Sequence, residues 1–219
     1  MADNTDNTYK VLLVNGSPQP KGCTARAFDE LEKTLHECGI TTERINVGNK
    51  DIRGCIACQY CKTHGKCVFN DAVNETAPKF AEADGLIVGT PVYYAGANGQ
   101  LHSFMDRLFY STSGTVDTNQ KVGATVVSSR RAGSTSAFDS INHYFTIASM
   151  PIVSSTYWNE VHGFTAEDVN DDFEGLQTMR NLGRNAAFLI KAIRAQKEKE
   201  GLPEQEKAVF TNFHTEARQ

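Results

Sequence analysis

The chain has 219 residues, 40% of them hydrophobic, and its 22 basic and 26 acidic side chains give a formal net charge of −4. This length favours one large domain, and the composition is typical of a globular protein with a substantial core. Nucleic-acid binding is not expected without a basic excess. No apolar run is long enough to span a bilayer, and residues 1–10 lack the order of a signal peptide. We therefore expect a cytoplasmic protein that binds neither nucleic acid nor membrane.

Strands and helices are predicted to alternate along the chain. The first strand, residues 9–15, contains the apolar run Val11–Val14 before Gly16, which is typical of a strand buried on both faces of a parallel sheet. Residues 24–38 then place apolar side chains at helical spacing. The same patterns predict further strands at 42–47, 85–90, 122–128 and 151–155, and further helices at 74–82, 98–110, 135–148 and 174–200.

This alternation predicts an α/β fold, in which helices cover both faces of a parallel sheet. Five strands fit a flavodoxin-like three-layer αβα sandwich with strand order 2-1-3-4-5 better than a dinucleotide fold with two halves. We expect residues 1–200 to form a single domain with a cysteine-rich insertion at 54–67. Residues 201–219 are expected to form a loosely held tail, in which Val209, Phe210 and Phe213 could dock on a partner.

The segment from Asn15 to Ala25 links the first strand to the first helix and is a candidate phosphate loop. In an open parallel sheet the ligand binds beyond the carboxyl ends of the strands, where a helix N-terminus offers unpaired amides. Ser17 and Thr24 could add hydroxyl hydrogen bonds. Neither GxGxxG nor GxxxxGK[ST] occurs, which argues against an NAD fingerprint and a P-loop. The alternative is a simple turn with Thr24 near a helix cap.

The third strand runs into the sequence GTPVYYAGANGQL at residues 89–101, which is followed by Phe104, Asp106 and Arg107. This segment resembles the G-[ST]-P-x-Y…G-x-L-x-x-F-x-D-R signature of the NADPH-dependent FMN reductase family. Together with the sequence NGSP at residues 15–18, the resemblance covers about residues 9–156. It implies a flavodoxin-like fold that binds FMN.

By position, the resemblance implies that the first loop holds the FMN phosphate and that the Pro-x-Tyr loop lies along the isoalloxazine. The loop at residues 128–133 would approach the edge of the ring. The implied FMN-binding residues are Ser17, Gln19, Lys21, Cys23, Thr24, Ala25, Pro91, Val92, Tyr93, Tyr94, Gly96, Ser129, Arg130 and Gly133. Many family members carry an arginine in the first loop, and Lys21 would replace its charge without its bidentate geometry.

The chemistry of these residue types suits a flavin. An isoalloxazine is a flat, largely apolar ring with a polar edge, so it needs an apolar wall and a few hydrogen-bond donors. Tyr93 or Tyr94 can supply the wall, although Tyr94 could equally be a core aromatic residue. Arg130 or Arg131 could stabilise the anionic reduced flavin, or the two arginines could be a solvated pair.

Four of the six cysteines lie within thirteen residues with the spacing C-x2-C-x2-C-x5-C: Cys55, Cys58, Cys61 and Cys67. Thiolates at this spacing can ligate a [4Fe–4S] cluster, whereas structural zinc sites usually use two separated CxxC pairs. The motif is similar to that of the iron–sulfur flavoproteins, a branch of the same family that also carries it after strand two. We expect it on the side of the sheet where FMN binds. The alternatives are a zinc site and free or redox-active thiols.

The resemblance implies an enzyme: an FMN-dependent oxidoreductase that takes electrons from NAD(P)H, or from ferredoxin if a cluster is present. Its acceptor would be a small molecule such as a quinone, a flavin, or a nitro or azo compound. Hydride transfer to a flavin requires no protein acid or base, so no catalytic residue is predicted. The alternatives are a non-catalytic electron carrier with FMN and a [4Fe–4S] cluster, and a redox sensor. The family also implies a homodimer or homotetramer.

Overall fold

The computed structural model describes residues 8–207, 209 and 211. Five parallel strands form one sheet in the order β2-β1-β3-β4-β5: β1 (Tyr9–Asn15), β2 (Ile40–Asn46), β3 (Gly85–Pro91), β4 (Val122–Ser129) and β5 (Glu160–His162). Six α-helices belong to the described part of the chain: α1 (Cys23–Glu37), α2 (Tyr60–His64), α3 (Ala72–Glu82), α4 (Gly99–Thr112), α5 (Ser134–Ile147) and α6 (Phe173–Glu200). The predicted α/β fold and the strand order 2-1-3-4-5 are confirmed.

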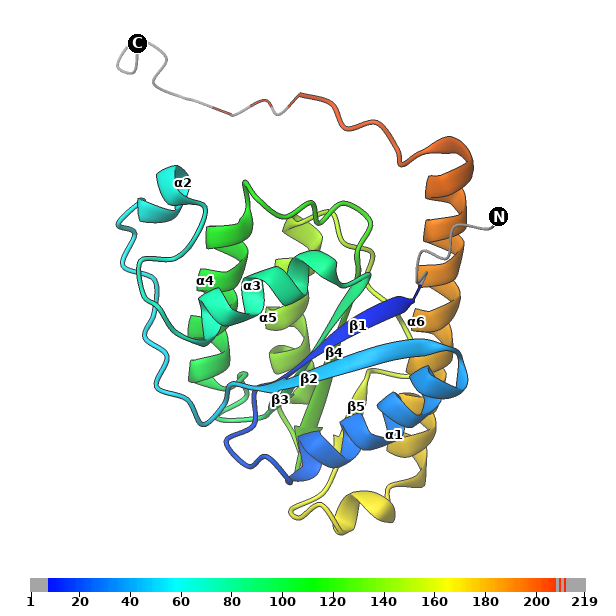
Figure 1. Cartoon of the computed structure of the whole chain (residues 1–219). Helices are drawn as coiled ribbons and strands as arrows, with labels where there is room; N and C mark the ends of the chain where they lie inside the picture. Colours follow the sequence, from blue (N-terminus) through cyan, green and yellow to red (C-terminus); the bar gives the residue numbers. More distant parts are fainter. Residues whose placement is uncertain (1–7, 208, 210, 212–219) are drawn as a thin grey trace.

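The sheet is buried on both faces (Figure 1). Val11 and Leu13 of β1 pack into the core cluster that contains the buried faces of α1 and α6. Leu12 and Val14 point to the opposite face and pack into the cluster formed with α3, α4 and α5. Successive side chains of a strand alternate between the two faces, so the continuous apolar run supplies both cores.

The fifth strand does not lie where the sequence pattern predicts it. Residues 151–155 contact β4 at an isolated bridge between Gly123 and Ile152, and the strand itself is formed by Glu160–His162. Pro151 has no amide hydrogen, so it only accepts, from the Gly123 amide at 2.8 Å. The chain then leaves the sheet and returns to pair Val127 with Glu160. The apolar run thus begins the strand position without continuing it.

The structure also contains short elements that the sequence patterns do not predict. They are α2, within the cysteine segment, and a 3-10 helix, η1, at Asp168–Asn170. No helix in the described part of the chain is long and apolar enough to cross a membrane. The division into a domain at 1–200 and a tail at 201–219 stays a prediction. Val209 is exposed, and Phe210 and Phe213 lie outside the described residues.

Candidate functional site

A cavity of about 190 Å³ lies at the carboxyl ends of the central strands. Because β1, β3, β4 and β5 are parallel, the loops that follow them meet at this edge of the sheet. The residues that line the cavity come from all four of these loops and from the start of α1: Ser17, Gln19, Gly22, Cys23, Pro91, Val92, Tyr93, Ser128, Ser129, Arg130, Gly163 and Phe164.

The loop after β1 is held in shape by its own hydrogen bonds. The Gly16 amide donates to the Gly89 carbonyl at 2.7 Å, the Ser17 amide donates to Asn15 Oδ1 at 3.0 Å, and the Gln19 amide donates to Ser17 Oγ at 3.1 Å. The first-turn amides of α1, from Cys23 to Ala25, have no acceptor among the residues that the structure describes. These amides and the positive end of the helix dipole suit a phosphate group.

A second loop supports the first one from behind. The Val47 and Gly48 amides, which follow β2, both donate to the Asn15 carbonyl. A Cβ atom at Gly48 would overlap the carbonyl oxygen of Gly16 and the carbonyl carbon of Ser17. Only a residue without a side chain allows this close approach of two backbones. Gly48 therefore fixes the position of the candidate phosphate loop, although no motif in the sequence points to it.

The loop after β3 forms a tight two-residue turn. The amides and carbonyls of Tyr93 and Gly96 exchange two hydrogen bonds of 2.9 Å, and the two residues between them, Tyr94 and Ala95, have φ values of 50° and 61°. Left-handed backbone at a residue other than glycine is strained and is frequent at functional sites. Tyr94 is fully exposed, so the alternative of a core aromatic residue is wrong.

Two contacts fix this turn against its neighbours. The Val92 amide donates to the Ser128 carbonyl at 3.0 Å, and a Cβ at Gly133 would come within 2.8 Å of Ala95 Cα. Gly133 has a φ of +89° and begins α5. The turn is therefore wedged between β4 and the start of α5, and its apolar residues face the cavity.

Arg130 is the one charged side chain that lines this cavity in the described part of the chain. It is exposed, whereas Ser128 and Ser129 beside it are buried. Ser129 Oγ lies 3.2 Å from His162 Nδ1, which ties β4 to β5 at the cavity. A single cation and an open helix N-terminus give the site a positive balance that favours an anionic ligand.

Eight of the predicted FMN-binding residues line the cavity: Ser17, Gln19, Cys23, Pro91, Val92, Tyr93, Ser129 and Arg130. Ala25, Gly96 and Gly133 shape it from behind, and Lys21 and Tyr94 lie outside its lining. The Thr24 hydroxyl lies 2.8 Å from Ser128 Oγ and is buried, so Thr24 offers its amide rather than its hydroxyl. Burial raises the pKa of the Cys23 thiol, which donates to the Thr165 carbonyl at 3.2 Å.

Sequence reasoning missed Phe164. This residue lines the cavity and is exposed over 79% of its surface. It follows β5, so its position at the carboxyl edge depends on where that strand ends. The strand was predicted about five residues too early, and the loop after it was therefore misplaced.

The four clustered cysteines line a separate small cavity over α4. Ile56, Val68, Phe69 and Tyr110 give it apolar walls, and Cys55 and Cys58 are exposed. Ala57 and Gln59, between the first three cysteines, have φ values of 53° and 62°. This left-handed backbone coils the segment so that the four sulfur-bearing residues face one space.

Arg107 is the buried cation of this second cavity. Its side chain is 1% exposed and donates to both carboxylate oxygens of Asp71, at 2.7 and 2.9 Å. Its Nε and one terminal nitrogen each lie 3.3 Å from Cys67 Sγ. Burial would lower the pKa of Arg107, but the hydrogen bonds to Asp71 and Cys67 outweigh it and raise that pKa. A permanent cation therefore faces the sulfur of Cys67.

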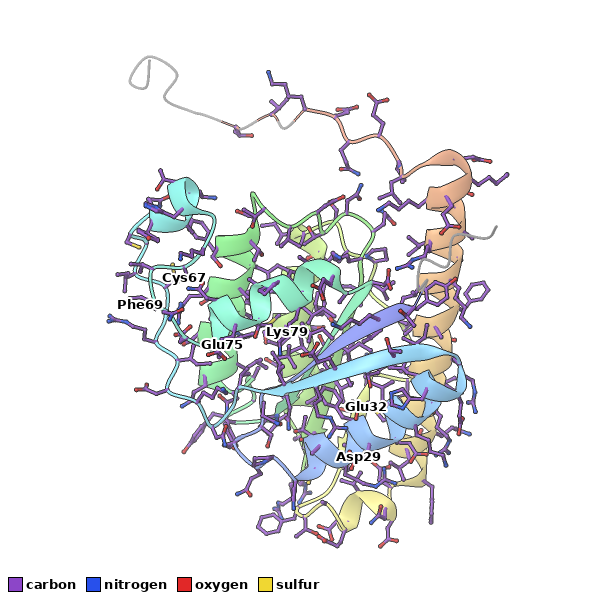
Figure 2. All side chains as sticks on the ribbon, in the orientation of Figure 1. Asp29, Glu32, Cys67, Phe69, Glu75 and Lys79 are labelled. Carbon is purple, nitrogen blue, oxygen red and sulfur yellow. The ribbon has the colours of Figure 1, made fainter. Side chains whose placement is uncertain are left out.

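The cysteine cavity lies away from the FMN-side cavity, contrary to the expectation from its place after strand two. The two cavities share no lining residue. Asn98, at the start of α4, follows the turn after β3, whereas the cysteines contact Arg107 and Tyr110 further along the helix. That separation is on the order of 15 Å along the helix axis. Figure 1 shows α2 at the top left and the start of α1 at the bottom. In Figure 2, Cys67 and Phe69 are labelled on the segment that leads into α3.

The comparison with protein families decides the identity of the fold. A family model described as NADPH-dependent FMN reductase matches residues 9–165, which include the loops of the FMN-side cavity. The chain belongs to the NADPH-dependent FMN reductase family. It is therefore an FMN-binding oxidoreductase, and the cavity at the carboxyl edge is its candidate flavin site.

Known relatives agree with this assignment. An iron–sulfur flavoprotein of Methanocaldococcus jannaschii is 37% identical over 191 residues, which cover 84% of this chain and 99% of the relative. Among solved structures, RosB with bound 8-demethyl-8-formylriboflavin-5'-phosphate superposes with a TM-score of 0.70 at 18% identity, over 97% of this chain and 94% of RosB. A flavodoxin from Archaea gives a TM-score of 0.54 at 17% identity, over 83% of this chain and 99% of the flavodoxin. The two structural likenesses show the flavodoxin-like fold.

The residues present fit both groups that these findings bring into question. Open amides, an apolar wall from Pro91 to Tyr93 and the cation of Arg130 suit the phosphate and the ring of FMN. Four thiols with apolar walls and a cationic donor to sulfur suit an iron–sulfur cluster. No group of three or more His, Cys, Asp or Glu residues within the described ranges is arranged to hold a metal ion. The donor set, rather than its present geometry, supports a cluster.

Proposed function

We propose that this chain transfers electrons from NAD(P)H, through FMN, to a small-molecule acceptor. The observation that carries this proposal is the combination, in one cavity, of the open N-terminus of α1 with the apolar turn at Pro91–Gly96. When bound there, FMN would supply the hydride and electron chemistry. The protein holds the phosphate with the α1 amides and presents Tyr93 and Phe164 toward the ring.

The cavity also explains why no catalytic residue is needed. Its lining contains no carboxylate, lysine or histidine side chain within the described residues, so it has no acid–base pair of its own. Its residues bind, orient and shield a cofactor, and the open face beside the exposed Tyr94 leaves room for a nicotinamide or an acceptor. Exposed aromatic residues around this face also support a homodimer or homotetramer.

We further propose that Cys55, Cys58, Cys61 and Cys67 hold a [4Fe–4S] cluster. The support is the shared cavity, the donors from Arg107 to Cys67, and the iron–sulfur flavoprotein relative. Iron and labile sulfide in anaerobically purified protein test it. We expect equal amounts of both, lost in Cys58→Ser and kept in the control Cys38→Ser, which changes a cysteine outside the segment. Protein without iron would overturn the assignment.

A second candidate is a non-catalytic carrier that contains both cofactors. The separation of the two cavities favours it, because a cofactor at each site would let electrons enter on one side of the molecule and leave on the other. Steady-state oxidation of NADPH and NADH by the FMN-loaded protein distinguishes the two. We expect turnover with at least one nucleotide when a quinone is added. No turnover with either nucleotide, together with rapid reduction by ferredoxin, would establish the carrier.

A further inference from the structure

The largest cavity of the described structure belongs neither to the flavin site nor to the cysteine cavity. It has a volume of about 680 Å³ and lies between the C-terminal halves of α4 and α5, beside the loop at residues 113–119 and Gln205. Pockets that bind small organic molecules measure about 300–1,000 Å³. Cys55 and Tyr110 line both this cavity and the cysteine cavity, so the two are neighbours.

The walls of the large cavity are aromatic and aliphatic. The Phe109 and Tyr144 rings lie with their centroids 5.5 Å apart, and Tyr110 adds a third ring. Val116 lies opposite them in the lining, and Ile147 is 87% exposed at the mouth. Aromatic rings stack favourably on flat apolar molecules. An exposed isoleucine beside such walls leaves apolar surface in water that a ligand would cover.

The polar groups of the lining define the charge of its ligand. Asp106 and Asp117 are the charged side chains in the lining, and no lysine, arginine or histidine is among the lining residues that the structure describes. Tyr144 donates to Asp106 at 2.6 Å. Burial and this carboxylate raise the pKa of Tyr144, so the phenol stays neutral. Two carboxylates disfavour an anionic ligand.

A cation also lies near this cavity, outside its lining. Lys62 Nζ is 4.5 Å from the centroid of the Tyr110 ring and donates to Ser113 Oγ at 3.1 Å. It therefore offsets part of the negative charge at one end of the cavity. The side-chain amide of Asn119 and the hydroxyl of Ser149 supply donors for carbonyl oxygens. Together these groups suit an uncharged ring that carries carbonyl groups.

We propose that this cavity binds a flat, uncharged aromatic acceptor of the quinone class, which receives electrons beside Cys55 and not at the flavin. The inference rests on the proposed function, because the electrons come from NAD(P)H. The quinone gains two electrons and two protons and becomes a hydroquinone, while NAD(P)H loses a hydride and becomes NAD(P)⁺. One proton comes from the nucleotide and the other from solvent, so the reaction balances.

Binding is tested separately from turnover by calorimetry with the full-length protein. The probe is 2,3-dimethyl-1,4-naphthoquinone, whose substituted quinone ring does not alkylate thiols. We expect Ile147→Glu to weaken its binding at least tenfold, because this change places a charge at the apolar mouth. The control Phe188→Glu changes a residue on α6 that is also exposed, at 71%, and should leave the affinity within twofold. Equal affinity of both variants, or no binding to the native chain, would overturn the proposal.

A second probe tests the charge argument. Anthraquinone-2-sulfonate should bind at least tenfold more weakly than the uncharged quinone. The double variant Asp106→Asn, Asp117→Asn should narrow that gap, because it keeps the hydrogen-bond acceptors and removes both charges. Tighter binding of the sulfonate to the native chain would contradict the proposal. If Ile147→Glu dissociates an oligomer without weakening the binding of the uncharged quinone, the cavity belongs to a second copy instead. Quinone binding without nucleotide oxidation would refute the proposed function and leave the binding site intact.

Discussion

Arg107 and Cys67 are joined by two N–H···S contacts of 3.3 Å, made by a guanidinium that is 1% exposed. A buried cation is costly unless it is fully paired, and Arg107 is paired by the carboxylate of Asp71 on one side. The sulfur of Cys67 completes its surroundings. Because Arg107 also belongs to the sequence signature that follows β3, the flavin-side motif and the cysteine motif meet at this one side chain.

Arg107→Met should destabilise the fold and the cysteine cavity together. We expect a loss of about 2–4 kcal/mol in the free energy of unfolding, because Asp71 is left without its partner in a half-buried position. Iron content after anaerobic purification should also fall. Denaturant unfolding and iron analysis measure the two effects. The control is Arg53→Met, because Arg53 is exposed and also lies over the Phe69 ring, at 4.7 Å. Equal effects of both substitutions would contradict the role assigned to Arg107.

Gly48→Ala should release FMN without touching the cavity lining. The added methyl group would displace the backbone of Gly16 and Ser17 and shift the α1 amides away from the phosphate position. We expect FMN affinity to fall at least tenfold, measured by ultrafiltration of the flavin-loaded protein. Gly114→Ala is the matched control, because a Cβ there meets open space. An unchanged affinity in Gly48→Ala would show that the two loops can separate without cost.

Replacing Ser17 and Thr24 together with alanine should also weaken FMN retention. Ser17 Oγ holds the Gln19 amide, and Thr24 Oγ1 pairs with Ser128 Oγ between α1 and β4. Their loss loosens the loop and the start of the helix at once. The fraction of flavin that stays bound after gel filtration measures the effect. The control is Thr41→Ala, in which a hydroxyl that contacts the Tyr9 carbonyl, at the other end of the sheet, is removed. Flavin content equal to that of native protein would refute the phosphate assignment.

Glu30 predicts a pH-dependent part of the stability. It joins α1 to α6 through Arg180 at 2.6 Å and pairs with Arg26 along its own helix. Burial would raise the pKa of Glu30, but the hydrogen bonds to the two arginines outweigh it and lower that pKa. The pairing therefore stabilises the fold fully above the unfolded pKa of about 4.3, and its contribution disappears as pH falls through the lower folded value.

Glu30→Gln tests this linkage. At neutral pH it should cost about 1–2 kcal/mol, because a charge-assisted pair becomes a neutral one. The difference from the native protein should shrink as the pH falls below about 4, where the native carboxyl also becomes protonated. Urea unfolding across this range measures it. Glu37→Gln, an exposed change on the same helix, should show no such trend. A constant difference at all pH values would exclude ionisation as its source.

The sequence predicts those parts of the fold that depend on local periodicity. Buried runs such as Val11–Val14 are predicted because burial on both faces demands continuous apolar residues. β5 is misplaced because its position is set by pairing with β4 across the sheet, and an apolar run at Pro151 does not show where that pairing occurs. Gly48 escapes notice for a similar reason, since its role depends on a backbone far away in the sequence.

The candidate sites follow the same division. Loop residues next to a strand end, such as Ser17 and Pro91, are predictable because parallel topology fixes where strand ends lie. The direction of a side chain within a loop is not, as the buried hydroxyl of Thr24 and the exposed ring of Tyr94 show. The cysteine segment was expected beside the flavin because it follows β2, but the chain runs along α4 before it reaches Cys55.

The open first turn of α1 has a consequence for the protein without its cofactor. The N-cap position is Gly22, which brings no side chain to the amides from Cys23 to Ala25. A bound phosphate would act as the missing helix cap, a role that polar side chains fill elsewhere at a gain of about 0.5–2 kcal/mol. Flavin binding and folding are then coupled, so the cofactor raises the melting temperature of the whole domain in proportion to its occupancy. Cells that run short of flavin would hold this protein in its least stable form.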